Sequence, residues 1–569
     1  MSVADVAPYD ILIIGGGTAG CVLAARLSEL PLLRVLLVEA GPDSEPGREP
    51  SDLRDPYPLA LGNHAYSWPR VTAEGTVSPD APPPTSRPFL QGFGIGGSSN
   101  IQGMIAFRGQ PADYDAWHEG GAQGWEWRSV LPYFRKLERD LDFTGPLHGT
   151  EGPIPVRRIR PTDWAPIARA AAAALQRQGF PLIEDYNADF SDGVSSLPMA
   201  SLPAQRVSAS MAYLSNPVRR RLNLTVRTGV LAERLVIEEG HVRGVRLRTA
   251  SGTQIVMARE TIVSCGALFS PALLMRSGIG PAGALRALGL DVIRDLPGVG
   301  RNLQNHPKIE LAFHLPLRSV QLREQRGLGQ NCLRYSSKHK DCDPHDLGFI
   351  IINRGAWHPL GRRVGALGIA LYKPYSTGRI ELTSADPAIP PHVNFNALSD
   401  ARDLKRLTAG LRLACELLAD PEVAAARNEV FFPDGRTVVR LRRKRPRAFV
   451  EAAAIAAALD VPPLRRALLR RHTLAVQELA RDEAALRAIV ARRAGVSHHA
   501  CGTCRMGRIG DPNAVVDNAC HVRGVAGLRV VDAAIFPTIV RGNTHLPVLM
   551  VAEKMADQIK SELEGGARA

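Results

Sequence analysis

The spacing of apolar and polar residues at the start of the chain predicts a strand, a turn, a helix and a second strand. Residues 9–14 form a short apolar run rich in β-branched residues, which is typical of a buried strand. Apolar positions between 22 and 27 suit a helix, and residues 34–39 form a second strand-like run. The segment between the first strand and the helix is a run of glycines, so the pattern predicts a strand–glycine turn–helix–strand unit.

The glycine turn has the spacing of a dinucleotide-binding fingerprint. Gly15 permits a tight turn, Gly17 lets the backbone approach a pyrophosphate, and Gly20 lets the helix pack closely on the strand. The helix N-terminus would supply amides and a favourable dipole for the phosphates. Glu39 ends the second strand about twenty residues further on, where a carboxylate can bind ribose hydroxyls and would repel a 2′-phosphate. The unit therefore predicts FAD or NAD rather than NADP.

Later motifs separate FAD from NAD. Residues 92–109 concentrate small residues around two serines, which exposes backbone amides and hydroxyls to an anionic ligand. This stretch resembles the first signature of the glucose–methanol–choline (GMC) oxidoreductases, flavoenzymes in which it lies along FAD. Residues 266–280 resemble the second signature, and further family blocks are resembled, in the family's order, by residues 297–306, 376–382, 499–507 and 528–537. Only the segment from about 428 to 479 has no match to the family, and the resemblance implies FAD.

Three positions depart from the family pattern. Gln102 stands where the family usually has Asn, although Asn100 lies two residues earlier, and Asn305 replaces a common Asp. Ile101 occupies the position at which some members link the flavin through a histidine, so noncovalent FAD is implied. The residues predicted to bind FAD are Gly15, Gly17, Thr18, Ala19, Gly20, Glu39, Gly96, Gly97, Ser98, Asn100, Gln102, Gly103, Met104, Val230, Asp532 and Ala533.

Oxidation of an alcohol requires removal of a hydroxyl proton and of a hydride from the same carbon. The flavin accepts the hydride, and histidine suits the base because its ordinary pKa of about 6.5 lies near neutrality. The resemblance implies His499 as this base, and it implies His545 at a second catalytic position that is His or Asn in different members. His498 is interpreted as a structural or polar-lining residue, and His306 as a structural one.

The resemblance also implies the architecture. We expect an α/β fold in which a Rossmann-like FAD-binding domain is combined with a discontinuous substrate domain, built on an antiparallel sheet backed by helices. The FAD domain would comprise residues 1–160, 205–312 and 500–569, and the substrate domain residues 161–204 and 313–499. The substrate would lie between the domains, over the flavin.

Composition adds limits rather than a new function. The chain is 45% hydrophobic and 22% charged, with no apolar run long enough to span a bilayer and no secretory signal pattern at its start. These features predict a cytoplasmic location. Eight cysteines in 569 residues do not suggest a disulfide framework, and the Cys501–Cys504 spacing lacks the second ligand pair of a zinc site. We interpret them as ordinary thiols and expect no metal.

The net charge of +14 is concentrated in part at residues 440–447. No aromatic residues are interleaved there and no nucleic-acid-reading module is present, so nucleic acid is not an expected partner. The run is interpreted as a solvated face, with peripheral contact to anionic lipid on the inner face of the membrane as the alternative.

The sequence is also compatible with other functions. The same scaffold supports a hydroxynitrile lyase in which FAD accepts no hydride, and a photodecarboxylase is a more remote relative. A non-catalytic flavoprotein or a basic surface-binding module is an alternative from a different class. The sequence does not identify the alcohol, the oligomeric state or the electron acceptor, which could be oxygen, a quinone or a redox protein.

Overall fold

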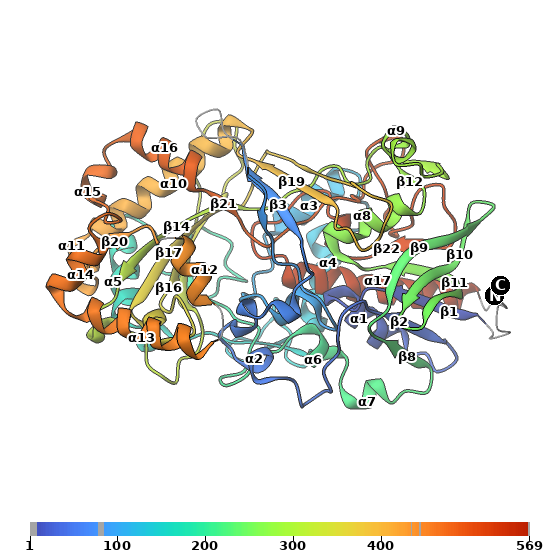
Figure 1. Cartoon of the computed structure of the whole chain (residues 1–569), viewed down its shortest axis with the longest axis horizontal. Helices are drawn as coiled ribbons and strands as arrows, with labels where there is room; N and C mark the ends of the chain where they lie inside the picture. Colours follow the sequence, from blue (N-terminus) through green and yellow to red (C-terminus); the bar gives the residue numbers. More distant parts are fainter. Residues whose placement is uncertain (1–7, 78–84, 434, 443–444, 567–569) are drawn as a thin grey trace.

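The computed structural model describes residues 8–77, 85–433, 435–442 and 445–566. Its main frame consists of two seven-stranded sheets. The first sheet lies at the end of the molecule that carries both termini, and the second lies toward the opposite end (Figure 1). The predicted combination of a Rossmann-like α/β fold and an antiparallel sheet backed by helices is confirmed.

The first sheet contains a parallel core assembled from three distant parts of the chain. Its strands run in the order β8-β2-β1-β11, and β22 pairs with β11. β11 also continues into an antiparallel extension with β10 and β9. The strands are β8 (Leu224–Arg227), β2 (Val35–Val38), β1 (Tyr9–Ile14), β11 (Gly252–Val263), β22 (Leu528–Val530), β10 (His241–Thr249) and β9 (Leu231–Glu238).

Two helices pack together beside this sheet, one from each end of the chain. α1 (Thr18–Leu27) is apolar on nearly all sides, which matches its position between the sheet and α17 (His545–Gly566). Arg26 of α1 forms an ion pair of 2.8 Å with the buried Glu553 of α17. This contact joins α17 to α1, and the N-terminus of α17 lies at the functional site described below.

The second sheet is antiparallel and has two different faces. Its strands are β20 (Val430–Phe431), β14 (Pro307–His314), β17 (Val364–Leu371), β16 (Leu347–Ile352), β15 (Gly329–Tyr335) and β7 (Gly193–Ser196), and β21 (Gly495–Val496) pairs with β14. Alternate residues such as Leu311, Phe349 and Ile351 are buried in one core cluster, which is shared with α10 (Ala401–Ala419), α16 (Glu483–Arg493) and α5 (Pro166–Arg177). The residues between them point the other way, because strand side chains alternate.

The two sheets account for the discontinuity expected from the sequence, but the exact domain boundaries stay a prediction. β14 begins at Pro307, ahead of the expected boundary at residue 312, and belongs entirely to the second sheet. Residues 428–479, in which the sequence showed no family motif, contain β20 and, in their described part, the four helices α12 (Gly435–Arg442), α13 (Pro446–Asp460), α14 (Pro462–Leu469) and α15 (Val476–Leu479). Residues 443–444 of the basic run lie outside the described residues. None of the helices in the described ranges is long and apolar enough to cross a membrane.

Candidate active site

The main cavity, of about 410 Å³, lies between the two sheets. One side is formed where β1 and β2 end, at Gly15 and Glu39, which is the edge at which doubly wound sheets bind ligands. The opposite side is the outward face of the second sheet, with Ile350, Ile352 and Ala370 among its residues. The cavity therefore joins a nucleotide-type edge to an apolar sheet face.

The glycine turn brings backbone unusually close to backbone. Gly15 has a φ of 104°, a conformation that favours glycine. A Cβ on Gly20 would lie 1.9 Å from the carbonyl oxygen of Gly15, and a Cβ on Gly97 would lie 2.8 Å from the Cα of Gly17. Glycine is therefore required for α1 to pack on β1 and for the 92–104 loop to approach the turn.

Glu39 organises the nucleotide side of the cavity. Its carboxylate accepts hydrogen bonds from the backbone amides of Gly16 (2.8 Å), Gly41 (2.8 Å) and Gly94 (3.1 Å). The carboxylate thus ties the glycine turn to the 92–104 loop and is held rigidly at the cavity. Its two oxygens together have about four acceptor sites, so the three amides leave capacity for a ribose hydroxyl.

The 92–104 loop supplies polar groups on the flavin side. Arg206, fully buried, donates to the carbonyls of Asn100 and Gln102, with 2.5 Å to the latter, and so fixes the loop from behind. Gln102 lines the cavity, and its buried side-chain nitrogen has no hydrogen-bond partner among the described residues. An unpaired amide donor in this position fits a carbonyl-bearing ring such as a flavin.

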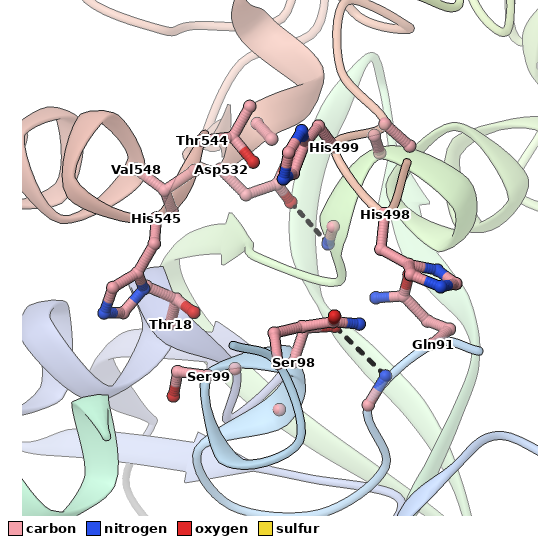
Figure 2. Close-up of a pocket in the computed structure, with 18 of the residues that line it drawn as sticks. Thr18, Gln91, Ser98, Ser99, His498, His499, Asp532, Thr544, His545 and Val548 are labelled. Atoms are coloured by element: carbon pink, nitrogen blue, oxygen red, sulfur yellow. Dashed lines mark hydrogen bonds between the residues drawn. The ribbon is translucent and has the colours of Figure 1, made fainter. Parts of the chain in front are cut away.

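Asp532 holds the loop at the carboxyl end of β22. Its carboxylate accepts hydrogen bonds from the amides of Gly266 (2.7 Å) and Ala534 (2.7 Å) and from the hydroxyl of Ser270 (2.5 Å). Burial raises the pKa of Asp532 in spite of these bonds. Figure 2 shows Asp532 on the same side of the cavity as His499.

Most of the residues predicted to bind FAD line this one cavity: Gly15, Gly17, Thr18, Ala19, Glu39, Gly97, Ser98, Gln102, Gly103, Met104, Val230, Asp532 and Ala533. Three others have supporting positions instead. Gly20 packs against the turn, and the amide of Gly96 donates to the carbonyl of Gly16. Asn100 donates to the carbonyl of Ile95 at 2.6 Å and so stabilises the loop rather than the cavity wall.

His499 belongs to a hydrogen-bonded chain that fixes its protons. The Nε2 atom of His306 lies 3.0 Å from the carbonyl oxygen of Val540, which only accepts, so this nitrogen carries a hydrogen. The Nδ1 atom of a neutral His306 is then an acceptor, and it lies 2.8 Å from Nδ1 of His499. His499 must therefore donate from Nδ1, which leaves the lone pair on its Nε2.

The partner at that lone pair is Asn543, not His545. The side-chain nitrogen of Asn543 lies 3.0 Å from Nε2 of His499. His545, the first residue of α17, also lines the cavity, but Figure 2 shows its ring beside Thr18 at the start of α1. His499 therefore contacts Asn543 directly, and the assignment of His545 to the second catalytic position stays a prediction. In the sequence, the only indication of Asn543 was that different family members have either Asn or His at the second catalytic position.

The environment of His499 keeps it neutral. Burial lowers its pKa well below the ordinary value, and positive charge on His306, His498 or Lys308 would lower it further. Asn305 positions both His306 and His499, because its side-chain oxygen accepts hydrogen bonds from the backbone amides of these two residues, at 2.9 and 3.2 Å respectively. The neighbouring His498 turns to another part of the cavity, where its ring packs 4.8 Å from that of Phe89.

A dinucleotide-binding sheet whose cavity also contains a buried, neutral histidine is typical of a dinucleotide-dependent oxidoreductase. The chain belongs to the GMC oxidoreductases: the model of the family's N-terminal domain matches residues 9–308 and that of its C-terminal domain matches residues 374–552. It is an FAD-dependent alcohol oxidoreductase. The second match includes residues 428–479, so the expectation that this segment has no match to the family was wrong.

Individual relatives cover nearly the whole chain. A 5-(hydroxymethyl)furfural oxidase from Methylovorus sp. (strain MP688) is 40% identical over 97% of this chain and 99% of its own. An oxygen-dependent choline dehydrogenase from Photobacterium profundum is 32% identical over 97% and 93%. Among solved structures, pyridoxine 4-oxidase from Mesorbium loti superposes with a TM-score of 0.80 at 29% identity, covering 97% of this chain and 99% of that one. These matches do not favour the hydroxynitrile lyase alternative.

Proposed function

We propose that His499 is the catalytic base and that Asn543 stabilises the alkoxide in the oxidation of a primary alcohol. The observation that carries this assignment is the chain from Val540 through His306 to His499, which leaves one basic nitrogen directed at Asn543. A substrate hydroxyl placed against both side chains can give its proton to Nε2 and accept a hydrogen bond from the amide. FAD supplies the hydride acceptor.

His545 and the loop residues are assigned to the cofactor. His545 lies at the N-terminus of α17, beside Thr18, so we place it at the nucleotide rather than at the alcohol. Glu39 would bind the ribose, Gly15–Gly17 the pyrophosphate, and Gln102 a flavin carbonyl. Asp532 and Ala533 would lie near the ribityl chain and Val230 near the adenine.

FAD is expected to be held without a covalent bond, because Ile101 occupies the position of the linking histidine. Acid precipitation of the purified yellow protein should therefore release one intact FAD per chain into the supernatant. The measurement is the absorbance of the supernatant and of the redissolved pellet. Flavin that stays with the pellet would disprove the noncovalent mode.

The substrate side of the cavity favours a neutral, flat alcohol over a cationic one. Ile350, Ile352 and Ala370 present an apolar sheet face, while Lys308 is near enough to His499 to influence its pKa. Lys308 would repel a quaternary ammonium group beside the base, and its ion pair with Glu310, which also lines the cavity, weakens that repulsion. We infer a hydroxymethyl group on a flat ring, as in the substrate for which the 40% identical relative is named, with oxygen as the electron acceptor.

Reversing the charge of Lys308 should change this selectivity. Two unit charges about 6 Å apart interact by about 3 kcal/mol at an effective dielectric of 20, and partial exposure and the pairing of Lys308 with Glu310 (2.6 Å) reduce that value. We expect Lys308→Glu to raise kcat/KM for choline relative to 5-(hydroxymethyl)furfural by roughly tenfold, about 1.4 kcal/mol. Oxygen consumption with each of the two substrates is measured with an oxygen electrode. The control is Lys405→Glu on the exposed face of α10. An unchanged ratio would remove Lys308 from substrate selection.

The helices beyond the second sheet form a surface suited to an anionic bilayer. On α13 and α14 five apolar side chains are 45% to 66% exposed: Phe449, Val450, Val461, Leu464 and Leu468. Among the residues whose side chains the structure describes, the exposed arginines on or beside these helices are Arg440, Arg445, Arg447, Arg466, Arg470 and Arg471. A second copy of the chain would bring these like charges together, so we propose anionic lipid as the occupant.

Vesicle sedimentation tests this surface. Arginines near an anionic surface contribute about 1 kcal/mol each, so Arg445→Gln/Arg447→Gln should weaken binding to phosphatidylserine vesicles by roughly 30-fold. Turnover of a soluble alcohol should be unchanged, because neither Arg445 nor Arg447 lines the cavity. Arg128→Gln/Arg259→Gln, which neutralises two arginines that are 90% and 76% exposed elsewhere, is the control. Equal sedimentation of all three proteins would exclude the membrane role.

A further inference from the structure

A second cavity, of about 270 Å³, lies between residues 320–326 and 353–362. Four of its lining residues are arginines, Arg323, Arg326, Arg354 and Arg362, and we call it the arginine cavity. It is separate from the flavin cavity but shares a loop with it. Leu328 at the end of this loop lines the flavin cavity, and its carbonyl accepts hydrogen bonds from the amides of Asn353 (2.9 Å) and Arg354 (3.2 Å).

Guanidinium groups outnumber carboxylates around the arginine cavity. Arg326 forms an ion pair with Asp55, and Glu324 is the carboxylate that acts on Arg362. Arg354 instead donates to two backbone carbonyls, at 3.2 and 3.3 Å, and lies over an aromatic ring. Two carboxylates thus face four permanently charged arginines.

The remaining positive charge also acts on the arginines themselves. Burial lowers the pKa of Arg362, and the positive charges of Arg323, Arg354 and Arg363 lower it further. Burial lowers the pKa of Arg354 as well, and Arg326 contributes in the same direction. Like charges gathered around a cavity repel one another, and a bound anion would remove that repulsion.

We propose that the arginine cavity binds a phosphate-type oxyanion, either inorganic phosphate or the phosphate group of a small organic phosphate. The planar fork of each guanidinium matches two oxygens of a phosphate, and several forks around one cavity can hold a doubly charged group. The cavity has room for a phosphate with a small organic substituent. Bound there, the anion bridges the 320–326 segment to the 353–362 segment. This site is independent of the alcohol-oxidising function.

The test uses FAD-saturated protein, so that the pyrophosphate site is filled. Isothermal titration calorimetry and the thermal unfolding midpoint are measured with inorganic phosphate, with glycerol 3-phosphate and with sodium chloride at matched ionic strength. The variant is Arg323→Gln/Arg362→Gln, and the control is Arg470→Gln/Arg471→Gln, which removes two exposed arginines elsewhere. Because the variant relieves repulsion, its midpoint without phosphate should be no lower than that of the wild type.

We expect saturable binding of phosphate to the wild type and the control, and at least tenfold weaker binding to the variant. Tighter binding of glycerol 3-phosphate than of inorganic phosphate would identify an organic phosphate as the ligand, and the reverse order would identify free phosphate. A midpoint shift no larger than that caused by sodium chloride would overturn the proposal, as would equal phosphate affinity in variant and wild type.

Discussion

His499→Ala is expected to slow reduction of the bound flavin by an alcohol by roughly 10²–10⁴-fold, the usual contribution of a positioned general base. This corresponds to about 3–5 kcal/mol of transition-state stabilisation. FAD should remain bound, because the nucleotide side is held by Glu39, the glycine turn and the 92–104 loop, none of which depends on His499. Anaerobic stopped-flow measures the hydride step alone.

Neighbouring substitutions separate the roles within the site. Asn543→Ala removes the hydrogen-bond donor to the alkoxide and should slow reduction by roughly 10²–10³-fold. His545→Ala should weaken FAD binding more than it slows reduction, because its ring lies beside Thr18. His498→Ala should change the rate little. A severe defect in His545→Ala with near-normal reduction in Asn543→Ala would restore the assignment expected from the sequence, and near-normal reduction in His499→Ala would refute the base.

The pH dependence of flavin reduction tests the same site independently. Burial lowers the pKa of His499 in the folded protein, so its basic form persists below pH 6.5. The rate of flavin reduction should therefore stay flat from neutrality to below the ordinary histidine pKa. A fall in rate centred near pH 6.5 would contradict this environment.

Among the substitutions proposed for this protein, His148→Gln is expected to lower the free energy of unfolding most, by about 3–5 kcal/mol, because it breaks a buried charge network. The Nδ1 atom of His148 lies 3.3 Å from the carboxylate of Glu138 and 3.2 Å from that of Asp140, and its Nε2 lies 2.6 Å from Asp185. Arg108 and Arg158 supply the remaining positive charges. Glu138, Asp140 and His148 could geometrically hold a metal ion, but the two arginines and a protonated His148 already balance the three carboxylates.

The network also predicts how stability depends on pH. Burial opposes protonation of His148, but hydrogen bonds to Asp140, Asp185 and Glu138 outweigh it and raise its pKa to about 10. Because the folded pKa lies above the unfolded value of about 6.5, this stabilisation is complete below pH 6.5 and is lost between pH 6.5 and 10. The urea midpoint of the wild type should fall over that interval.

His118→Gln is the matched control, since His118 is 39% exposed and pairs with Glu126 at 2.8 Å. The free energy of unfolding of His118→Gln should differ from that of the wild type by less than about 1 kcal/mol. His148→Gln should lose most of the pH dependence between 6.5 and 10 as well as its stability. Parallel pH profiles for wild type and His148→Gln would show that His148 is not the titrating group.

The nucleotide half of the site could be predicted from sequence because its requirements are local. The turn needs glycine at Gly15 and Gly20 for steric reasons that involve only neighbouring elements, and a fixed strand–helix–strand length places Glu39 at the same edge. Family motifs added FAD and the position of His499. The sequence also led us to interpret Cys501 and Cys504 as ordinary thiols. Burial raises the pKa values of both thiols, which suits ordinary core residues.

The alcohol half of the site was decided by tertiary contacts that no local pattern records. Asn543 and His545 stand two positions apart in one motif and both are acceptable residue types, so only the backbone entering α17 determines which reaches His499. His306 looked structural in the sequence, yet it is 193 positions from the histidine whose proton it directs. Sequence therefore determined which residue types and turns were available, whereas the packing of β14, the 497–501 segment and the start of α17 decided which atoms meet. Hydrogen bonds act over about 3 Å in space without regard to separation along the chain.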